Sequence, residues 1–124
     1  MTKNEISVLI VDDEPDLLEI CADAFEMEDY KVYTALDGVK GLEAFMNNSV
    51  DVVISDSYMP EMNGLQLLKT IIDSEKEMPI FYLSTGAIDV TEDSLKEKGA
   101  TGLISKPFDL DEILERVSND LKAR

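Results

Sequence analysis

The 124-residue sequence contains no histidine and only one cysteine. The absence of histidine excludes a histidine nucleophile or general base, a Ser-His-Asp triad and the common zinc sites. A single cysteine excludes an internal disulfide, and the apolar helical spacing around Cys21 predicts a buried thiol in a reducing cytoplasm. Any metal site in this chain must therefore be built from oxygen ligands.

Basic residues are scarce as well. Eleven Lys and Arg stand against 27 Asp and Glu, which gives a formal net charge of -16. This charge repels nucleic acid and anionic lipid over about one Debye length, ~8 Å at physiological salt. Direct binding to nucleic acid is therefore not expected, and the charge indicates a well-solvated surface rather than a dedicated basic partner.

Long apolar runs are also missing. No run approaches the roughly 20 residues of a membrane helix, and the start of the chain lacks the apolar segment of a signal peptide. We therefore expect no membrane association and a cytoplasmic location. The length and the 44% hydrophobic content fit one domain with one core. The expected organisation is a single domain over residues 1–124, with its core at about 6–121 and no output domain.

The sequence does contain short apolar runs that alternate with longer stretches of helical periodicity, which indicates strand-then-helix units and parallel strands. The predicted strands are 7–11, 31–35, 52–55, 80–83 and 103–105. The expected fold is α/β, a three-layer doubly wound (βα)5 fold of flavodoxin-like type. Its five-stranded parallel sheet has the order 2-1-3-4-5.

Each intervening stretch predicts a helix with one apolar face. Pro15 is tolerated in the first turn, Asp37 and Asp109 are expected caps, and Gly99 is expected to end the fourth helix, near 91–98. That helix has Leu95 but few other apolar residues, so we expect it to be the least firmly anchored element. The predicted inward residues of the other helices are Leu17, Leu18, Cys21, Ala24 and Phe25; Val39, Leu42, Phe45 and Met46; Leu65, Leu68, Ile71 and Ile72; and Leu110, Leu114, Val117 and Leu121, with Phe108 packed on Ile113.

Chemically distinct side chains follow four of the predicted strands. They are the pair Asp12 and Asp13, then Asp56, Ser84 and Lys106. Carboxyl ends of parallel strands meet at one edge, and the ligand crevice opens where the strand order reverses, here between the first and third strands. The aspartates would then share one hard cation with carbonyl oxygens and water, as Mg²⁺ prefers. Ca²⁺ stays open, although no EF-hand spacing is present.

Clustered carboxylates repel one another, so a divalent ion, a lysine or both must offset their charge. Lys106 supplies a positive charge and Ser84 a hydroxyl donor, and both suit the oxygens of a phosphoryl group. Each residue alone has an ordinary alternative role as a cap, a turn residue or a surface charge. Their coincidence at successive strand ends indicates a site for a divalent cation and a phosphoryl group.

These motifs resemble the receiver domain of bacterial two-component response regulators, of the stand-alone type, over 6–121. The residues that carry the resemblance are Leu9-Ile10-Val11-Asp12-Asp13-Glu14, Asp56 with Met59-Pro60 and Met62-Asn63-Gly64, Ser84, and Lys106-Pro107-Phe108. The resemblance implies that Asp56 accepts a phosphoryl group from a phosphohistidine. It further implies that Mg²⁺ is held by Asp12, Asp13, Asp56 and the Tyr58 carbonyl, and that Lys106 and Ser84 contact the phosphoryl oxygens.

The implied donor is a sensor histidine kinase or a histidine phosphotransfer domain. The chain would catalyse its own phosphorylation and slow dephosphorylation without being a conventional enzyme. Movement of Ser84 toward the phosphoryl group would then change the face made by the fourth helix, fifth strand and fifth helix. That face would bind an effector protein that the sequence does not identify, or a second copy of the chain in a phosphorylation-dependent homodimer.

Two departures from the family pattern and two rival functions stay open. Leu103 stands where the family often has an aromatic switch residue, and Thr85 offers an alternative switch hydroxyl, although strand alternation favours Ser84.

The rival functions are a pseudo-receiver that phosphorylation does not regulate and a phosphohydrolase with an aspartate nucleophile. Such hydrolases usually carry a second aspartate two positions later, where this chain has Tyr58. Tyr58 either shields the aspartyl phosphate from water and slows its hydrolysis, or only packs on the loop, and both hypotheses stay open.

Overall fold

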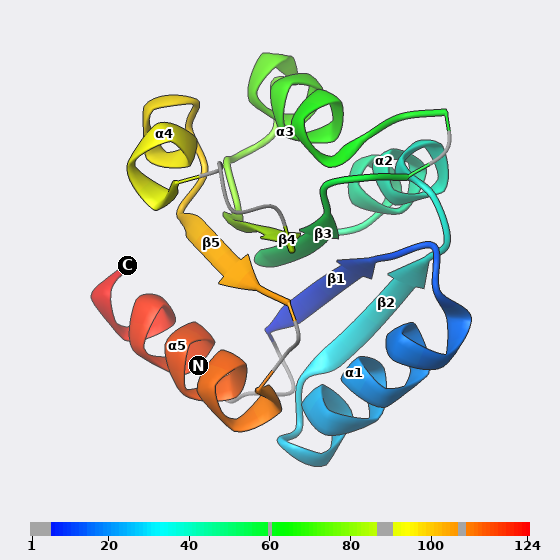
Figure 1. Ribbon diagram of the computed structural model, residues 1–124, viewed down its shortest axis with the longest axis vertical. Helices are drawn as coiled ribbons and strands as arrows, with labels where there is room; N and C mark the ends of the chain where they lie inside the picture. The colour runs from blue at the N-terminus through cyan, green and yellow to red at the C-terminus, as the bar shows by residue number, and fades with distance from the viewer. Residues whose placement is uncertain (1–5, 60, 87–90, 107–108) are drawn as a thin grey trace.

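The computed structural model describes residues 6–59, 61–86, 91–106 and 109–124. Strands and helices alternate along this part of the chain, as the periodicity predicts (Figure 1). The strands are β1 (Ser7–Val11), β2 (Lys31–Ala35), β3 (Val52–Asp56), β4 (Ile80–Thr85) and β5 (Gly102–Ser105). The helices are α1 (Pro15–Met27), α2 (Gly38–Asn47), α3 (Gly64–Asp73), α4 (Glu92–Glu97) and α5 (Leu110–Ala123).

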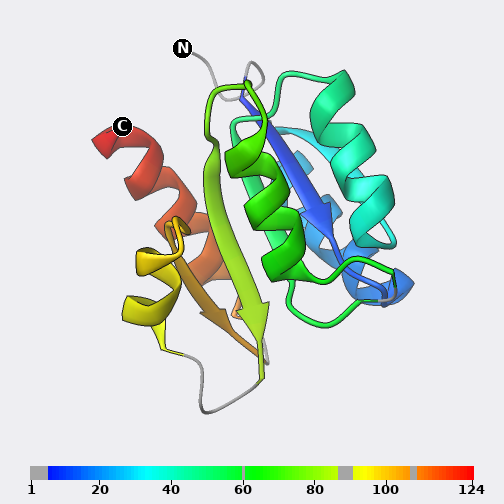
Figure 2. The same cartoon turned by 90° about the horizontal axis from the view of Figure 1, so that it is seen from above.

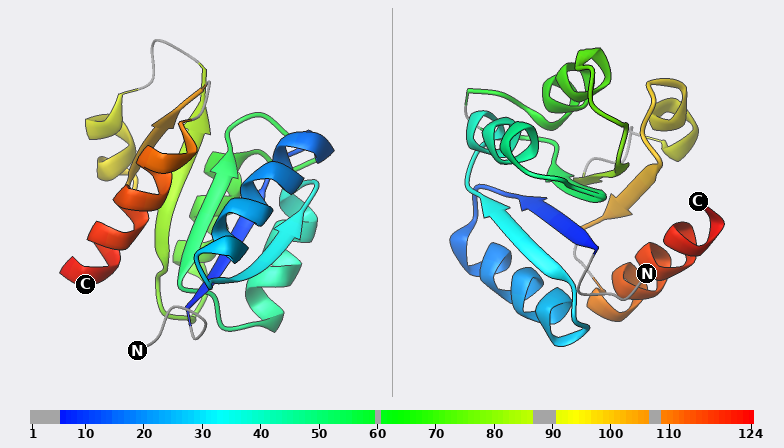
Figure 3. Two further views of the ribbon diagram at one scale, coloured as in Figure 1. Left: turned by 90° about the horizontal axis from the view of Figure 1, so that it is seen from below. Right: turned by 180° about the vertical axis from the view of Figure 1, so that it is seen from behind.

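The strands form one parallel sheet in the order β2-β1-β3-β4-β5, which confirms the predicted fold. Figures 2 and 3 show the arrowheads at a common edge of the sheet. The order reverses between β1 and β3, which pair with Val8 opposite Val52. Side chains that leave β1 and β3 at their carboxyl ends therefore enter the same crevice.

Two apolar layers cover the sheet. Helices α1 and α5 pack on one face, and α2, α3 and α4 pack on the other (Figure 1). The largest fully buried side chains include Phe25 of α1, Phe45 of α2, and Phe81 and Tyr82 of β4. Because both faces are covered, the central strands are apolar throughout rather than alternating.

The sequence prediction is partly wrong about which residues of α2 and α3 face inward. Val39 and Met46 are 43% and 46% exposed, and Leu65 and Ile72 are 38% and 44% exposed. In α2 the buried face runs through glycine instead: a Cβ on Gly41 would lie 2.8 Å from a Val11 methyl group. In α3 the inward residues are Leu67, Leu68 and Ile71, and in α1 Ala22 is buried while Ala24 is only partly so.

The predicted helix ends agree with the structure. Pro15 begins α1, the Asp37 carboxylate accepts from Lys40 N–H, and Asp109 accepts from two backbone N–H groups at the start of α5. Gly99, past the end of α4, has φ 102°, a conformation that favours glycine. The predicted roles of Pro60 and Phe108 fall outside the described residues. None of the described helices combines the length and apolar character needed to cross a membrane.

Candidate phosphoryl and metal site

The side chains predicted to meet do come from neighbouring strand ends. Asp12 directly follows β1, Asp56 is the last residue of β3, and Lys106 directly follows β5. Ser84 of β4 is paired in register with Asp56. Ile54 and Tyr82 belong to the core between the sheet and helices α1 and α5. Asp56 and Ser84 each lie two residues later in their strands, so strand alternation places both on that face of the sheet and Thr85 on the other.

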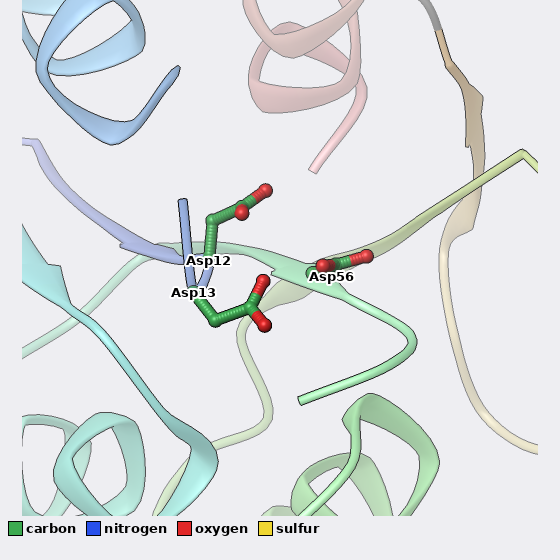
Figure 4. Close-up of side chains that lie close together, drawn as sticks. All are labelled: Asp12, Asp13 and Asp56. Atoms are coloured by element: carbon green, nitrogen blue, oxygen red, sulfur yellow. The ribbon is translucent and has the colours of Figure 1, made fainter. Parts of the chain in front are cut away.

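Three carboxylates form the centre of the site. One oxygen from each of Asp12, Asp13 and Asp56 lies within 4.8 Å of the other two (Figure 4). Asp12 and Asp56 are 3% and 7% exposed, whereas Asp13 is open to solvent. Oxygen ligands at this spacing, with one side open to water, fit Mg²⁺, which keeps several water molecules when bound to protein.

Backbone hydrogen bonds fix the orientation of Asp12. Its N–H donates to the Ala35 carbonyl of β2 at 3.1 Å, and its Oδ1 accepts from Glu14 N–H at 2.9 Å. The second carboxylate oxygen, Oδ2, remains directed at Lys106, whose Nζ lies 3.3 Å away. The turn from β1 into α1 therefore holds this carboxylate in place before any ligand arrives.

Lys106 bridges the two buried carboxylates. Its Nζ lies 3.3 Å from Asp12 Oδ2 and 3.3 Å from Asp56 Oδ1. Partial burial acts to lower the pKa of Lys106, but the charges of Asp12 and Asp56 together raise it above its usual value. The ammonium group therefore stays charged between the two carboxylates.

The environment of Asp56 disfavours its ionised form. Burial raises the pKa of the carboxyl, the charge of Asp12 raises it further, and Lys106 opposes both effects. Apolar side chains, including Leu18, Cys21 and Ile113, line the space beneath the carboxylates. Because one lysine does not balance this acidic cluster, a divalent cation would stabilise the ionised form.

The hydroxyl of Ser84 is buried beside Asp56. Ser84 is 1% exposed, and its hydroxyl has no hydrogen-bond partner among the described residues. A buried hydroxyl without a partner costs about 1–3 kcal/mol. An oxygen acceptor bound to Asp56 would supply the missing partner, which fits the predicted role of Ser84.

The loop after Asp56 is held close to the backbone of that residue. Gly64 N–H donates to the Ser57 carbonyl at 3.1 Å, and a Cβ on Gly64 would overlap the Asp56 carbonyl oxygen. The side chains of Asn63 and Gln66 form a capping box at the start of α3. Sequence reasoning identified the Asn63-Gly64 turn but not this close approach. The side chain of Tyr58 is 72% exposed, and the metal role of its carbonyl stays a prediction.

The chain is similar to known proteins over most of its length. The sequence model of the response regulator receiver domain matches residues 8–118. Response regulator SaeR of Staphylococcus aureus (strain USA300) is 33% identical over 112 residues, 90% of this chain and 49% of that protein. The chain thus spans about half the length of the curated relatives it matches.

Solved structures show the same fold. Chemotaxis response regulator CheY4 of Vibrio cholerae has a TM-score of 0.82 and 29% identity, with 92% of this chain and 97% of that chain covered. A chain of the CheX-CheY-BeF3-Mg²⁺ complex from Borrelia burgdorferi has a TM-score of 0.83 and 30% identity, with 94% and 89% covered.

Proposed function

The chain belongs to the response regulator receiver family, and from this premise we propose that it accepts a phosphoryl group on Asp56 from a phosphohistidine in another protein. The donor that membership of this family implies is a sensor histidine kinase or a histidine phosphotransfer domain. The observation that carries the proposal is the buried Asp56 carboxylate, 3.3 Å from Lys106 and clustered with two further aspartates.

In the proposed reaction, a carboxylate oxygen of Asp56 attacks the phosphorus atom in line with the bond to the donor imidazole. The new P–O bond forms as the P–N bond breaks, and the electron pair leaves with the imidazole nitrogen. Lys106 neutralises charge on the transferred oxygens, and Ser84 donates its hydroxyl to one of them. Asp12, Asp13, Asp56 and the Tyr58 carbonyl would hold Mg²⁺, which supplies further charge neutralisation when bound.

The proposed output is a change of partner binding at the face made by α4, β5 and α5. Ser84 lies on β4, next to β5 in the sheet, so its movement toward a phosphoryl group would act on this side of the molecule. Leu95 is the one residue of α4 that is fully buried, which favours rearrangement there. The partner is an effector protein or a second copy of the chain, and we place the reaction in the cytoplasm.

Intact-mass measurement after incubation with acetyl phosphate and Mg²⁺ tests this proposal. We expect the wild-type chain to gain the mass of one phosphoryl group, and the Asp56→Asn variant to gain none. EDTA should prevent the gain in the wild type. An unmodified wild-type chain would favour the pseudo-receiver, and turnover of phosphate esters beyond self-hydrolysis would favour the phosphohydrolase.

A further inference from the structure

The outer edge of β5 is the feature that the proposed phosphoryl chemistry does not use. β5 is the last strand in the sheet order, so among the described residues no strand pairs with its outer side. Lys106 N–H donates toward β4, to the Thr85 carbonyl at 3.1 Å. Because successive residues of a strand direct their backbone groups to opposite sides, the N–H and C=O of Leu103 face the free edge.

Side chains from two helices occupy these backbone groups. Arg116 of α5 donates from Nη1 to the Leu103 carbonyl at 2.7 Å. The Leu103 N–H donates to Glu92 Oε1 of α4 at 3.4 Å, and Arg116 Nη2 donates to the same oxygen. Together Glu92 and Arg116 make the two hydrogen bonds to Leu103 that an additional strand would make. They also join α4 to α5 across β5, with one helix on each face of the sheet (Figure 1).

The Arg116 side chain is positioned by further contacts. Its guanidinium lies over the ring of Tyr82, 5.1 Å from the centroid, and its Nε lies 3.8 Å from Asp120 Oδ2. The same Asp120 oxygen accepts a hydrogen bond from the Tyr82 hydroxyl. A planar guanidinium suits this combination of ring stacking and several hydrogen bonds, which an ammonium group would not reproduce.

Gly102 provides the space that the pair needs. A Cβ at this position would overlap both Arg116 Nη2 and Glu92 Oε1. The side chains of Glu92 and Arg116 are 39% and 33% exposed, so water can replace their contacts when they separate. The Glu92–Arg116 contact therefore depends on a specific geometry, and solvent can replace it when the two side chains separate.

We propose that Glu92 and Arg116 form a latch that closes the free edge of β5 and holds α4 in place, and that phosphorylation opens it. The first half, closure of the β5 edge by Glu92 and Arg116, follows from the contacts. The second half, opening by phosphorylation, rests on the proposed function. The latch acts on the backbone of Leu103, where the resembled family often has an aromatic switch residue. In this chain a polar contact between α4 and α5, rather than the rotation of an aromatic side chain, controls the face made by α4, β5 and α5.

Amide hydrogen exchange measured by NMR on the full chain tests the first half. In Arg116→Gln and Glu92→Gln, we expect the Leu103 amide to exchange at least tenfold faster than in the wild type, with faster exchange across α4 as well. The matched control is Arg124→Gln, which removes an arginine whose ion pairs are with Asp51 and Glu77, outside the latch. It should leave Leu103 unchanged. Unchanged Leu103 exchange in both latch variants would overturn the latch.

Slow exchange of the β1 and β3 amides in each variant shows that the fold is intact. A latch variant that loses this protection is replaced by Glu92→Asp, which keeps the charge but shortens the side chain. Faster Leu103 exchange in that variant supports the latch, and wild-type exchange overturns it.

The second half is tested by adding beryllofluoride and Mg²⁺ to the wild-type chain. We expect Leu103 exchange to rise toward the rate of Arg116→Gln, and to stay unchanged in Asp56→Asn. If acetyl phosphate modifies the wild type but Leu103 exchange does not respond to beryllofluoride, the regulation by phosphorylation is overturned and the proposed function stands. If the wild type is never phosphorylated, the proposed function fails, and the variant exchange rates still decide whether the latch exists.

Discussion

Mg²⁺ is expected to raise the thermal stability of the wild-type chain because it relieves repulsion within the acidic cluster. One oxygen from each of the three aspartates lies within 4.8 Å of the others. Two like charges at that separation repel by roughly 3 kcal/mol with an effective dielectric constant of about 20, and solvent screening reduces the share of the exposed Asp13. Lys106 alone, at 3.3 Å from Asp12 and Asp56, cannot neutralise all three charges.

The size of the stabilisation follows from mass action. A ligand present at a hundred times its dissociation constant stabilises the folded state by about 2.7 kcal/mol. For a domain of this size, the melting temperature rises by roughly 4 °C per kcal/mol, which gives an increase of about 10 °C. Without Mg²⁺, Asp56→Asn is expected to be more stable than the wild type, because burial raises the pKa of Asp56 and its ionised form opposes folding.

Circular dichroism melts in EDTA and in saturating Mg²⁺ measure both effects. The Mg²⁺-dependent shift should largely disappear in Asp13→Asn and Asp56→Asn. Asp23→Asn, at an exposed position on α1, should keep the wild-type shift. If Mg²⁺ leaves the wild-type melting temperature unchanged, or if Asp13→Asn responds as strongly as the wild type, the three aspartates do not bind the ion as expected.

Three further predictions concern the surroundings of Asp56. Tyr58→Ala should shorten the lifetime of the aspartyl phosphate several-fold in a mass-spectrometric decay assay, and equal lifetimes would count against shielding. Cys21 is 5% exposed and burial raises its pKa to about 11, so the native thiol should resist iodoacetamide until urea unfolds the chain; rapid native labelling would contradict its burial. Gly64→Ala should destabilise the fold by about 1–3 kcal/mol in urea titration, because its Cβ would overlap the Asp56 carbonyl. Gly86→Ala, where none of the described residues lies within 4 Å of the added Cβ, should have a much smaller effect.

The strands and the convergence of polar side chains at one sheet edge could be predicted because the strand signals are local to the sequence. Runs such as 7–11 and 52–56 are apolar and rich in β-branched residues, as strands covered on both faces require. A polar side chain stands at the carboxyl end of each run, Asp12 directly after the first and Asp56 at the end of the second, and parallel topology brings these ends to one edge. The position of each strand end was therefore enough to predict that three side chains lie close together, those of Asp12, Asp56 and Lys106.

The errors arose where packing depends on small residues or distant partners. Gly41 lies on the inward face of α2 against Val11, but a search for apolar side chains does not count glycine, so it predicted Val39 and Met46 to be buried. Glu92 and Arg116 are 24 residues apart and belong to no motif that the sequence displays. Their contact depends on how α4 and α5 pack beside β5, which periodicity does not determine.

We propose that Asp56 itself carries the phosphoryl group. Reduction of the acetyl phosphate-treated chain with borohydride, followed by tandem mass spectrometry, identifies the modified residue, because this reagent converts an aspartyl phosphate to homoserine and leaves a phosphoserine intact. We expect homoserine at position 56. Homoserine at position 12 or 13, or a stable phosphate on Ser84, would contradict it.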